Sequence, residues 1–451
     1  MENLALLEKY GLFDAKVPRY TSYPPANHFE AGIGQRNQSQ WLAQIEPTEP
    51  LSLYVHIPFC RRLCWFCACR TQGTKTLRPV EDYVDILMRE IDAVSFQLER
   101  QRDIARLHLG GGTPTLLSAT AMNKLLTSIF DNFSQTADFE FSVEIDPTEA
   151  SDDILSTLTK WGMDRASIGV QDFYPAVQEA IGREQSFEDT KRVVDILRGA
   201  SLKSLNMDLL YGLPHQTEPT IRRTLEDIKS LSPDRLALYG YAHVPHISKR
   251  QVMIPTDDLP DPRQRFKLAE IAQTMLSDSG YVMLGIDHFA KPDDGLAQAA
   301  AAGTMKRNFQ GYTDDPCDTL IGFGASAISK FRQGYSQNAV ATAAYVERVQ
   351  ASGMAGHRGY AMSPRDDFLA DMIEDLMCKG AINLDDLAAK HYKSGIDIRT
   401  VGHDLLTRFP DALTYQDNTL TLSAEAQSLC RVVAAAMDES LSADNVHSLA
   451  I

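Results

Sequence analysis

Four cysteines lie within ten residues of one another in the stretch HIPFCRRLCWFCACR, at positions 60, 64, 67 and 69 of a chain that has only seven. Structural zinc usually takes its ligands from two separated pairs, and no second pair of Cys or His lies nearby in the sequence. A redox C-x-x-C site would need only two of the four, and Cys64 and Cys67 have that spacing. Four thiolates can ligate an iron–sulfur cluster fully and make an electron carrier, whereas three leave one iron open for a small molecule. The spacing therefore favours a metal or redox centre.

The segments around this loop alternate between strand and helix patterns. The expected strands cover residues 51–58, 105–112, 139–146, 165–173, 204–214 and 235–242, with a further strand at 281–290. The expected helices cover residues 82–98, 118–133, 152–162, 187–200 and 220–231. Strictly alternating strands and helices predict an α/β fold with a parallel sheet and helices outside it, here a full or partial barrel of about six strands.

Three regions are expected along the chain: an N-terminal arm over residues 1–50, a barrel over 51–362 and a mainly helical domain over 363–451. The arm contains VPRYTSYPPANHF, which is typical either of a loop packed on the barrel or of a cover over an active-site mouth. The last region combines helices with a hairpin that turns at Asp417 and Asn418, as a winged-helix DNA binder would. Its seven basic and 15 acidic residues argue against that function.

The whole chain is acidic, with a formal net charge of −16, and 44% of its residues are hydrophobic. This charge opposes diffuse attraction to nucleic acid or to an anionic membrane surface. The sequence begins without a basic segment followed by a long apolar core, and no apolar run approaches the roughly 18 residues that cross a bilayer. We expect a cytoplasmic protein with reduced thiols and no membrane span.

The spacing C-x3-C-x2-C directly after an expected barrel strand resembles the radical S-adenosylmethionine (SAM) superfamily. The resemblance implies that Cys60, Cys64 and Cys67 hold a 4Fe-4S cluster whose open iron binds the amino and carboxylate groups of SAM. It also implies that the cluster passes an electron to the sulfonium, which releases a 5′-deoxyadenosyl radical.

Further stretches narrow the resemblance. PRYTSYP, LSLYVHIPFC, LHLGGGTPT, FSVEIDP, IGVQDF, NMDLLYGLP, RNFQGYT and GASAIS occur in order between residues 18 and 329. Together with Cys69 they are similar to the family of oxygen-independent coproporphyrinogen III oxidases, also called coproporphyrinogen dehydrogenases. The resemblance implies a partial (βα)6 radical SAM barrel, decarboxylation of coproporphyrinogen III to protoporphyrinogen IX in haem synthesis, and two SAM per chain. It further implies an electron donor such as flavodoxin or ferredoxin and a monomeric enzyme. Cys-Ala-Cys replaces the more usual Cys-Gly-Cys, and the stretch MCKGAINLDD is less typical of the family.

The family's functional positions can be carried over one by one. Those that match contacts to the first SAM are Tyr54, Gly111, Glu144 and Ile328. Those that match contacts to the second are Phe66, Gly112, Thr113, Gln171, Arg183, Asp208 and Ala242. Catalytic roles are expected for Tyr54, His56 and Cys69. Without the family, the glycines are more typical of a plain turn and His56 of a core histidine. The carboxylates could equally bind a ligand or pair with neighbouring arginines.

The expected substrate has four carboxylates, and the candidates to neutralise them are Arg19, Arg183, Lys306 and Arg307. The remaining cysteines, Cys317, Cys378 and Cys430, are expected to be ordinary thiols. Two alternatives stay open: a haem chaperone built on the same scaffold, and another radical SAM enzyme that acts on tetrapyrroles, such as a haem-degrading methyltransferase. Cys69 and RNFQGYT argue against the chaperone.

Overall fold

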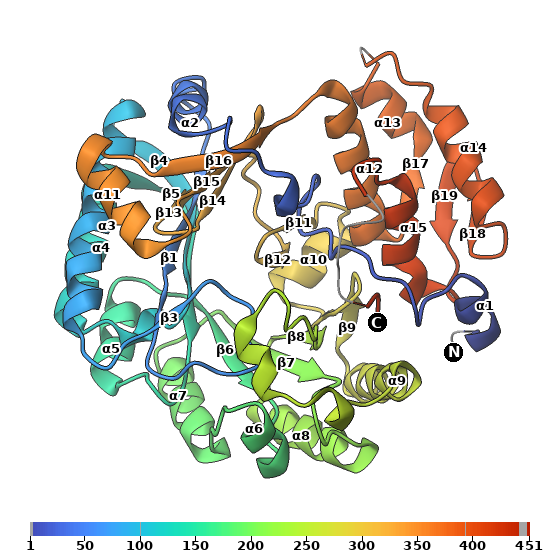
Figure 1. The fold of residues 1–451 in the computed structure, drawn as a ribbon, viewed down its shortest axis with the longest axis horizontal. Coiled ribbons are helices and arrows are strands. Elements are labelled where there is room, and N and C mark those ends of the chain that lie inside the picture. Colours follow the sequence, from blue (N-terminus) through green and yellow to red (C-terminus); the bar gives the residue numbers. More distant parts are fainter. Residues whose placement is uncertain (1–2, 100, 393, 442–448) are drawn as a thin grey trace.

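A computed structural model describes residues 3–99, 101–392, 394–441 and 449–451. Its centre is a sheet whose consecutive strands run parallel to one another, with helices on the outside (Figure 1). The parallel strands are β1 (Leu51–Ile57), β4 (Arg102–Gly111), β5 (Phe133–Ile145), β6 (Arg165–Gln171), β7 (Ser204–Tyr211) and β8 (Arg235–Gly240). β1 is buried along nearly its whole length, as strands covered on both faces must be. The predicted α/β partial barrel is confirmed.

The helices between these strands begin where the sequence supplies capping side chains. Ser118, Ser151 and Ser186 each accept a hydrogen bond from a backbone N–H in the first turn of the following helix. The outer helices are α3 (Arg78–Gln97), α4 (Ala119–Asn132), α5 (Asp152–Lys160), α6 (Pro175–Ala180), α7 (Phe187–Gly199), α8 (Glu218–Leu231) and α9 (Pro262–Asp278). Each of the predicted barrel helices is confirmed, with its ends shifted by a few residues.

The sheet extends beyond the six strands on both sides, to 12 strands in the order β16-β15-β14-β13-β1-β4-β5-β6-β7-β8-β10-β9. The added strands are β9 (Val282–Leu284), β10 (His288–Ala290), β13 (Leu320–Phe323), β14 (Ile328–Phe331), β15 (Gly334–Asn338) and β16 (Gly356–Ala361). The single strand expected at 281–290 is wrong. The segment reverses at Gly285, which has φ +57°, and β9 pairs antiparallel with β10. An added Cβ at Gly285 would lie 2.0 Å from the Tyr312 ring, so packing as well as conformation requires glycine there.

The C-terminal region forms its own hydrophobic core. It contains α12 (Pro364–Lys379), β17 (Ala381–Asn383), α13 (Leu384–Lys390), α14 (Ile398–Arg408), β18 (Leu413–Gln416), β19 (Thr419–Leu422) and α15 (Cys430–Met437). The predicted hairpin is confirmed: Asp417 and Asn418, both at positive φ, join β18 to β19. Helix α12 carries the predicted apolar stripe, with Phe368, Met372 and Leu376 buried.

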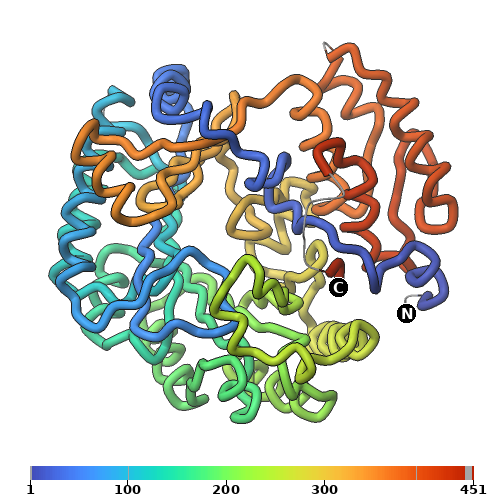
Figure 2. Tube along the Cα trace, in the orientation of Figure 1, coloured from blue at the N-terminus to red at the C-terminus, as the bar shows by residue number. Residues whose placement is uncertain are grey.

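The N-terminal arm packs against this C-terminal core. Leu7, Leu12, Tyr20 and Tyr23 are buried with the apolar side chains of α12 and α15. Figure 2 shows the arm running from α2, beside β16, along the C-terminal region to α1. These contacts join residues about 400 positions apart in the sequence. Whether the arm is only a loop packed on the barrel or also covers the active-site mouth stays a prediction.

Shorter elements complete the described chain. They are α1 (Leu4–Lys9), η1 (Ala26–His28), α2 (Gln35–Leu42), β2 (Phe59–Cys60), β3 (Gln72–Gly73), η2 (Pro114–Leu116), η3 (Lys249–Met253), η4 (Thr256–Asp258), α10 (Gly295–Ala301), β11 (Lys306–Asn308), β12 (Gly311–Thr313), α11 (Thr342–Ser352) and η5 (Gln427–Leu429). Within the described residues, no helix is long and apolar enough to cross a bilayer.

A buried carboxylate on α3 fixes the sheet beside the cysteine loop. Glu90 accepts hydrogen bonds from the Gly324 N–H at 2.8 Å, the Tyr345 hydroxyl at 2.8 Å and the Asn338 amide at 2.7 Å. From the same helix, Tyr83 donates to the His56 carbonyl at 2.9 Å. Helix α3 therefore holds both the end of β1 and the turn after β13.

Glu90→Ala should destabilise the fold, because it leaves three buried donors without an acceptor. We expect a loss of about 3 kcal/mol in the free energy of unfolding, measured by chemical denaturation at pH 5. Burial raises the pKa of Glu90 from its usual value to about 7. The pKa of Glu90 is higher in the folded than in the unfolded protein, so the wild type loses stability as the pH rises between these two values. The difference in the free energy of unfolding between the wild type and Glu90→Ala should therefore shrink as the pH rises. Glu81→Ala, an exposed position on the same helix, is the control; a difference independent of pH would contradict this account.

Candidate active site

The expected functional residues collect at one edge of the parallel sheet. Gly111 and Gln171 are the last residues of β4 and β6, and Glu144 lies one residue before the end of β5. Asp208 lies in the second half of β7, and Ala242 follows β8 by two residues. Because consecutive parallel strands end on the same side, the carboxyl ends of these strands bring together residues spread over more than 130 positions, at the end of an α/β barrel where function gathers.

The cysteine loop leaves β1 and lies against this edge. The Thr113 hydroxyl hydrogen-bonds Cys60, whose pKa is nevertheless raised by burial. Arg183 Nη1 lies 3.6 Å from Cys64 Sγ and 3.1 Å from Asp146 Oδ2. A buried guanidinium beside Cys64 stabilises negative charge on sulfur, which a ligating thiolate needs.

Cys69 lies directly beside Cys67. The contact with Cys69 lowers the pKa of Cys67 to about 6, and the charges of Arg250 and Arg183 act in the same direction, although burial works to raise it. The same contact raises the pKa of Cys69 well above its usual value. The two sulfurs are therefore close enough for their protonation to be coupled.

These donors match an iron–sulfur cluster with one open iron. One loop supplies three sulfurs, from Cys60, Cys64 and Cys67. The charges of Cys64 and Cys67 each raise the pKa of Cys60, so the three lie near one another. Within the described residues, no three His, Cys, Asp or Glu side chains converge to hold a single metal ion. Cluster ligands bind different irons, so their sulfurs need not converge on one point. The three cysteines therefore remain the candidate ligands.

The glycine loop after β4 packs against the cysteine loop. The Gly112 N–H donates to the Ile57 carbonyl at 2.8 Å and the Thr113 N–H to the Phe59 carbonyl at 2.9 Å. An added Cβ at Gly112 would lie 2.5 Å from the Phe59 carbonyl oxygen. At Gly111, with φ +111°, it would lie 2.5 Å from the His56 ring. The glycines thus allow two protein segments to touch, a requirement separate from any contact with a ligand.

Tyr54, His56, His108 and Glu144 form a connected row across β1, β4 and β5. The Tyr54 hydroxyl lies 2.9 Å from His56 Nδ1, and the Tyr54 ring stacks on His108 with centroids 5.7 Å apart. His108 Nε2 lies 3.4 Å from one Glu144 oxygen, and the Gly111 N–H donates to the other at 2.9 Å. Burial works to raise the pKa of Glu144, but these two partners lower it overall, so Glu144 is a carboxylate. Burial lowers the pKa of His56, which keeps it neutral.

The second group of candidates lies on β6, β7 and the following loops. Asp208 accepts hydrogen bonds from Ser167 at 2.9 Å and from Asn206 at 2.8 Å, and its pKa is raised by burial. Gln171 has φ +70°, a strained value for a residue with a side chain, and the β6–β7 register shifts beside it. Strain of this kind at a strand end is common at ligand sites. Arg183 is 8% exposed, and its Nε has no hydrogen-bond partner among the described residues.

Sequence reasoning missed a clamp after β8. Gln251 donates to the carbonyls of Phe66 at 2.8 Å and Ala242 at 3.0 Å, which joins two of the expected cofactor contacts. Ser248 donates to the Cys67 carbonyl at 3.0 Å, and Arg250 to the Thr71 hydroxyl at 2.8 Å. About 180 residues separate the partners in sequence, and nothing in the stretch SKRQ indicates that it meets the cysteine loop.

The remaining candidates lie in different places. Ile328 begins β14, and its carbonyl approaches Gly322, the β13 partner of Tyr54. Lys306 pairs with Asp318 at 3.1 Å near the surface. Arg307 is buried, lies over the Tyr312 ring at 4.3 Å and donates to the carbonyls of Arg19 and Tyr20. The three other cysteines lie apart from the loop, and burial raises the pKa of Cys317 and Cys430 to about 12, as expected of unreactive thiols.

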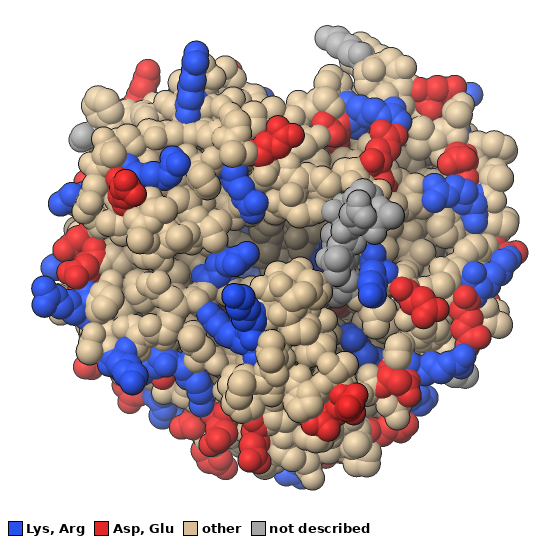
Figure 3. All heavy atoms as spheres, viewed as in Figure 1, with Lys and Arg blue, Asp and Glu red and all other residues tan. Residues whose placement is uncertain are grey.

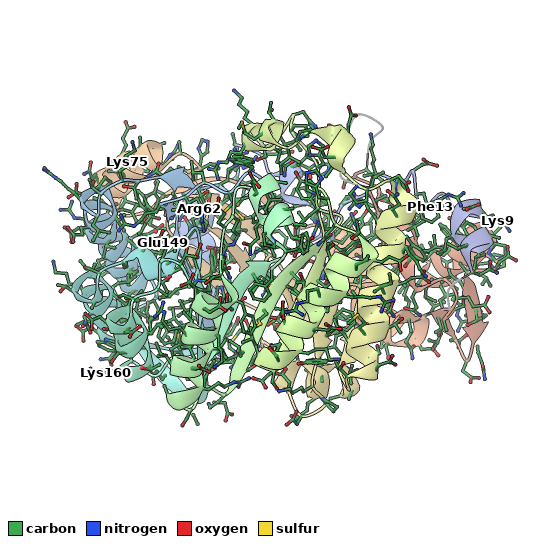
Figure 4. The ribbon with its side chains drawn as sticks, turned by 90° about the horizontal axis from the view of Figure 1, so that it is seen from below. Lys9, Phe13, Arg62, Lys75, Glu149 and Lys160 are labelled. Carbon is green, nitrogen blue, oxygen red and sulfur yellow. The ribbon has the colours of Figure 1, made fainter. Side chains whose placement is uncertain are left out.

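The charges around the site differ from those of the whole molecule. Figure 3 shows a hollow near the centre of this face, with Lys and Arg side chains around it, although the chain is acidic overall. Figure 4 shows Arg62 and Glu149 close together at the edge of the barrel, well away from Lys9 and Phe13 at the far end. Arg61, next in the loop, pairs with Glu149 at 3.0 Å, so the cysteine loop is also held from outside.

Comparisons with known proteins agree with this geometry. The model of the radical SAM superfamily matches residues 54–228. The oxygen-independent coproporphyrinogen III oxidase of Paracoccus denitrificans is 47% identical over 451 residues, which cover 100% of both chains. The enzyme of the same name from Escherichia coli is 41% identical over 376 residues, or 83% of this chain and 81% of that one. A solved structure of coproporphyrinogen III oxidase from Escherichia coli, described as a radical SAM enzyme, superposes with a TM-score of 0.91 at 35% identity, covering 98% of this chain and 99% of that one.

Proposed function

The chain belongs to the family of oxygen-independent coproporphyrinogen III oxidases, and we propose that it converts coproporphyrinogen III to protoporphyrinogen IX without oxygen, in haem synthesis. Two propionate side chains of the substrate each lose a hydrogen atom from the β-carbon, one carbon dioxide and one electron, and each becomes a vinyl group. The observation that carries the proposal is the full-length match to oxygen-independent coproporphyrinogen III oxidases, together with four cysteines in the loop that follows β1.

The chain is a radical SAM enzyme. When bound, the 4Fe-4S cluster and SAM supply a 5′-deoxyadenosyl radical that takes the hydrogen atom. Cys60, Cys64 and Cys67 would hold the cluster, and Arg183 stabilises the thiolate of Cys64. Glu144 offers a carboxylate, fixed by His108 and Gly111, to the amino or hydroxyl groups of the first SAM.

The second group of residues is proposed to bind a second SAM. Gln251 holds Phe66 and Ala242 together, Gln171 ends β6, and Asp208 lies in the second half of the neighbouring strand β7. Cys69 is proposed to act on the substrate, whereas Tyr54 and His56 are proposed to position it. His56 Nε2 lies 3.3 Å from the carbonyl oxygen of Arg70, the residue that follows Cys69. His56 on β1 therefore contacts the loop that carries the Cys69 thiol.

We also propose the remaining features of the enzyme from its family and charge. A one-electron donor such as flavodoxin or ferredoxin reduces the cluster, and the chain acts as a monomer in the cytoplasm. The arm over residues 1–50 is proposed to border the substrate site, because Arg19 in the arm donates to the Gly240 carbonyl at the end of β8 at 2.6 Å.

Anaerobic turnover tests the proposed function. The reconstituted protein, given SAM, a reductant and coproporphyrinogen III, should form protoporphyrinogen IX. This product is lighter than the substrate by two molecules of carbon dioxide and four hydrogen atoms, and it is identified by mass as protoporphyrin after oxidation. Coproporphyrinogen recovered unchanged, or a methylated tetrapyrrole, would contradict it. Stable binding of haem with no turnover would instead favour the chaperone.

A further inference from the structure

The segment after β8 presents apolar side chains to solvent. Ile247, Val252 and Met253 are 54%, 70% and 57% exposed. Nine large hydrophobic side chains are exposed in the described parts of the chain, and three of them lie within residues 247–253. Exposed apolar residues that are scattered singly are ordinary, but a group of them on one short segment marks a site of interaction.

The same segment is anchored on its other side. Gln251 donates to a carbonyl of the cysteine loop, and Ile254 is buried with Val177 of α6. Because η3 is a 3-10 helix, which repeats every three residues, Gln251 and Ile254 share its buried side. Lys249 and Val252, also three residues apart, share an exposed side. The exposed residues therefore lie on a fixed element, and their exposure is not that of a free loop.

The surroundings of this segment are basic, although the chain has a formal net charge of −16. Residues 241–256 contain two basic residues, and residues 51–80, which include the cysteine loop, contain five. Neither range contains an Asp or a Glu. Arg61 and Arg78 each pair with a carboxylate from outside these ranges. Arg70, Lys75 and Lys249 are exposed and have no ion-pair partner among the described residues.

The exposed side chains lie close to the candidate cluster ligands. Ser248 donates to the Cys67 carbonyl at 3.0 Å, and Arg250 donates to the Thr71 hydroxyl at 2.8 Å. In Figure 2 the yellow-green segment around residue 250 lies against the blue cysteine loop. The width of one short helix therefore separates the apolar surface from the loop that carries the three cysteines.

A small apolar centre with unpaired cations around it suits a transient protein partner of negative charge. Opposite charges speed the encounter of two proteins, and apolar contacts at the centre hold the complex. Interfaces of electron-transfer complexes are among the smallest that proteins form, so a short segment can supply much of one.

We propose that the η3 face, formed by Ile247, Lys249, Val252 and Met253, is the docking site of an acidic one-electron carrier protein. The inference rests on the proposed function, because a radical SAM enzyme needs a reductant for its cluster. One electron leaves the reduced carrier, which is oxidised by one electron, and enters the cluster, which is reduced by one. The basic residues of the cysteine loop add to the attraction at longer range.

Two other occupants are conceivable: the carboxylates of the substrate, and a second copy of this chain. The substrate must reach the cysteine loop itself, whereas Val252 and Met253 are exposed on the outside of η3, so attraction of the substrate does not explain them. A second copy carries the same basic face and would repel it.

The experiment uses an acidic flavodoxin as the carrier and dithionite as a chemical reductant that needs no docking site. The Kd of the reconstituted protein for flavodoxin is measured anaerobically by surface plasmon resonance, a readout that does not depend on turnover. The variants are Lys249→Glu, the double change Val252→Ser with Met253→Ser, and Lys75→Glu. The matched control is Lys124→Glu, which reverses the charge of an exposed lysine on α4.

We expect Lys249→Glu and the double serine variant each to raise the Kd for flavodoxin about tenfold, and Lys75→Glu to raise it by a smaller factor. Turnover driven by subsaturating flavodoxin should fall in proportion, while turnover driven by dithionite and the KM for coproporphyrinogen III stay at wild-type values. Added salt should weaken flavodoxin binding to the wild type more than binding to Lys249→Glu. Lys124→Glu should behave as wild type, and the cluster content of each variant is measured in parallel.

An unchanged Kd for flavodoxin in Lys249→Glu and the double serine variant overturns the proposal. If the double variant does not fold, an unchanged Kd in Lys249→Glu and Lys75→Glu overturns it equally. An equal loss of turnover with both reductants, or a raised KM for coproporphyrinogen III, shows a structural or substrate role and overturns it as well. So does a dimer in gel filtration that the double variant dissociates.

The docking site and the proposed function can fail separately. A wild type that forms protoporphyrinogen IX while the variants bind flavodoxin normally defeats the docking site alone. A wild type that forms no vinyl product with dithionite defeats the proposed function, and the flavodoxin Kd values of the variants still decide the docking site.

Discussion

Serine at position 60, 64 or 67 is expected to remove the iron–sulfur cluster and with it all turnover. Each of these cysteines is one of three sulfur ligands on one loop, and a hydroxyl is a poor replacement for a thiolate on iron. The iron content after anaerobic reconstitution should fall from about four atoms per chain in the wild type to close to zero in each variant. Visible absorbance and iron and sulfide analysis measure the effect.

Cys69→Ser is the informative comparison. Cys69 lies outside the C-x3-C-x2-C spacing of the three expected ligands, so the cluster should assemble. Turnover should fall about 100-fold or more, the scale on which a positioned proton-transfer group acts. Cys317→Ser, a change of a remote thiol, should leave both the cluster and the turnover intact. The ligand assignment is wrong if Cys69→Ser loses the cluster while Cys67→Ser keeps it.

The barrel could be predicted from sequence because its strands are buried on both faces and its helices begin at capping residues. β1 is apolar almost throughout, and Ser118, Ser151 and Ser186 mark helix starts that the structure confirms. The strands β13 to β16 were not predicted. They are four to six residues long, too short to show a clear strand pattern in the sequence. β13 forms by pairing with the edge of β1, a contact that the local sequence does not indicate.

The sequence predicts only those residues of the candidate site that lie near strand ends or within the family's motifs. Glu144 and Asp208 lie where parallel strands must end together, so their approach follows from topology. The clamp from Gln251 to the loop depends on how a segment beyond β8 folds back, which no local pattern encodes. The burial of Tyr20 and Tyr23 against α12 is likewise a contact between distant parts of the chain.

Two SAM molecules are expected to bind per chain, and two should be cleaved for each protoporphyrinogen IX formed. Each of two propionates loses one hydrogen atom, and each abstraction consumes one radical unless the cofactor is regenerated. The polar groups at the barrel edge exceed the needs of one cofactor. One group consists of Gly111 on β4 and Glu144 on β5. The other consists of Gln171 on β6, Asp208 on β7 and Gln251 after β8.

Asp208→Ala should weaken the second site and spare the first. The change removes a carboxylate in the second half of β7 that is proposed to accept hydrogen bonds from the second SAM, at a cost of about 1–3 kcal/mol in SAM binding, or roughly five- to 150-fold. It also leaves Ser167 and Asn206 without this acceptor. Asp208→Asn keeps the shape and isolates the effect of the charge. Anaerobic binding stoichiometry should fall from about two SAM per chain toward one at a fixed concentration, while cluster absorbance stays constant, because Cys60, Cys64 and Cys67 lie on a different segment. Methionine counted against vinyl groups completes the measurement. One bound SAM in the wild type, with one methionine per two vinyl groups, would defeat the two-cofactor proposal and require a radical that is used twice.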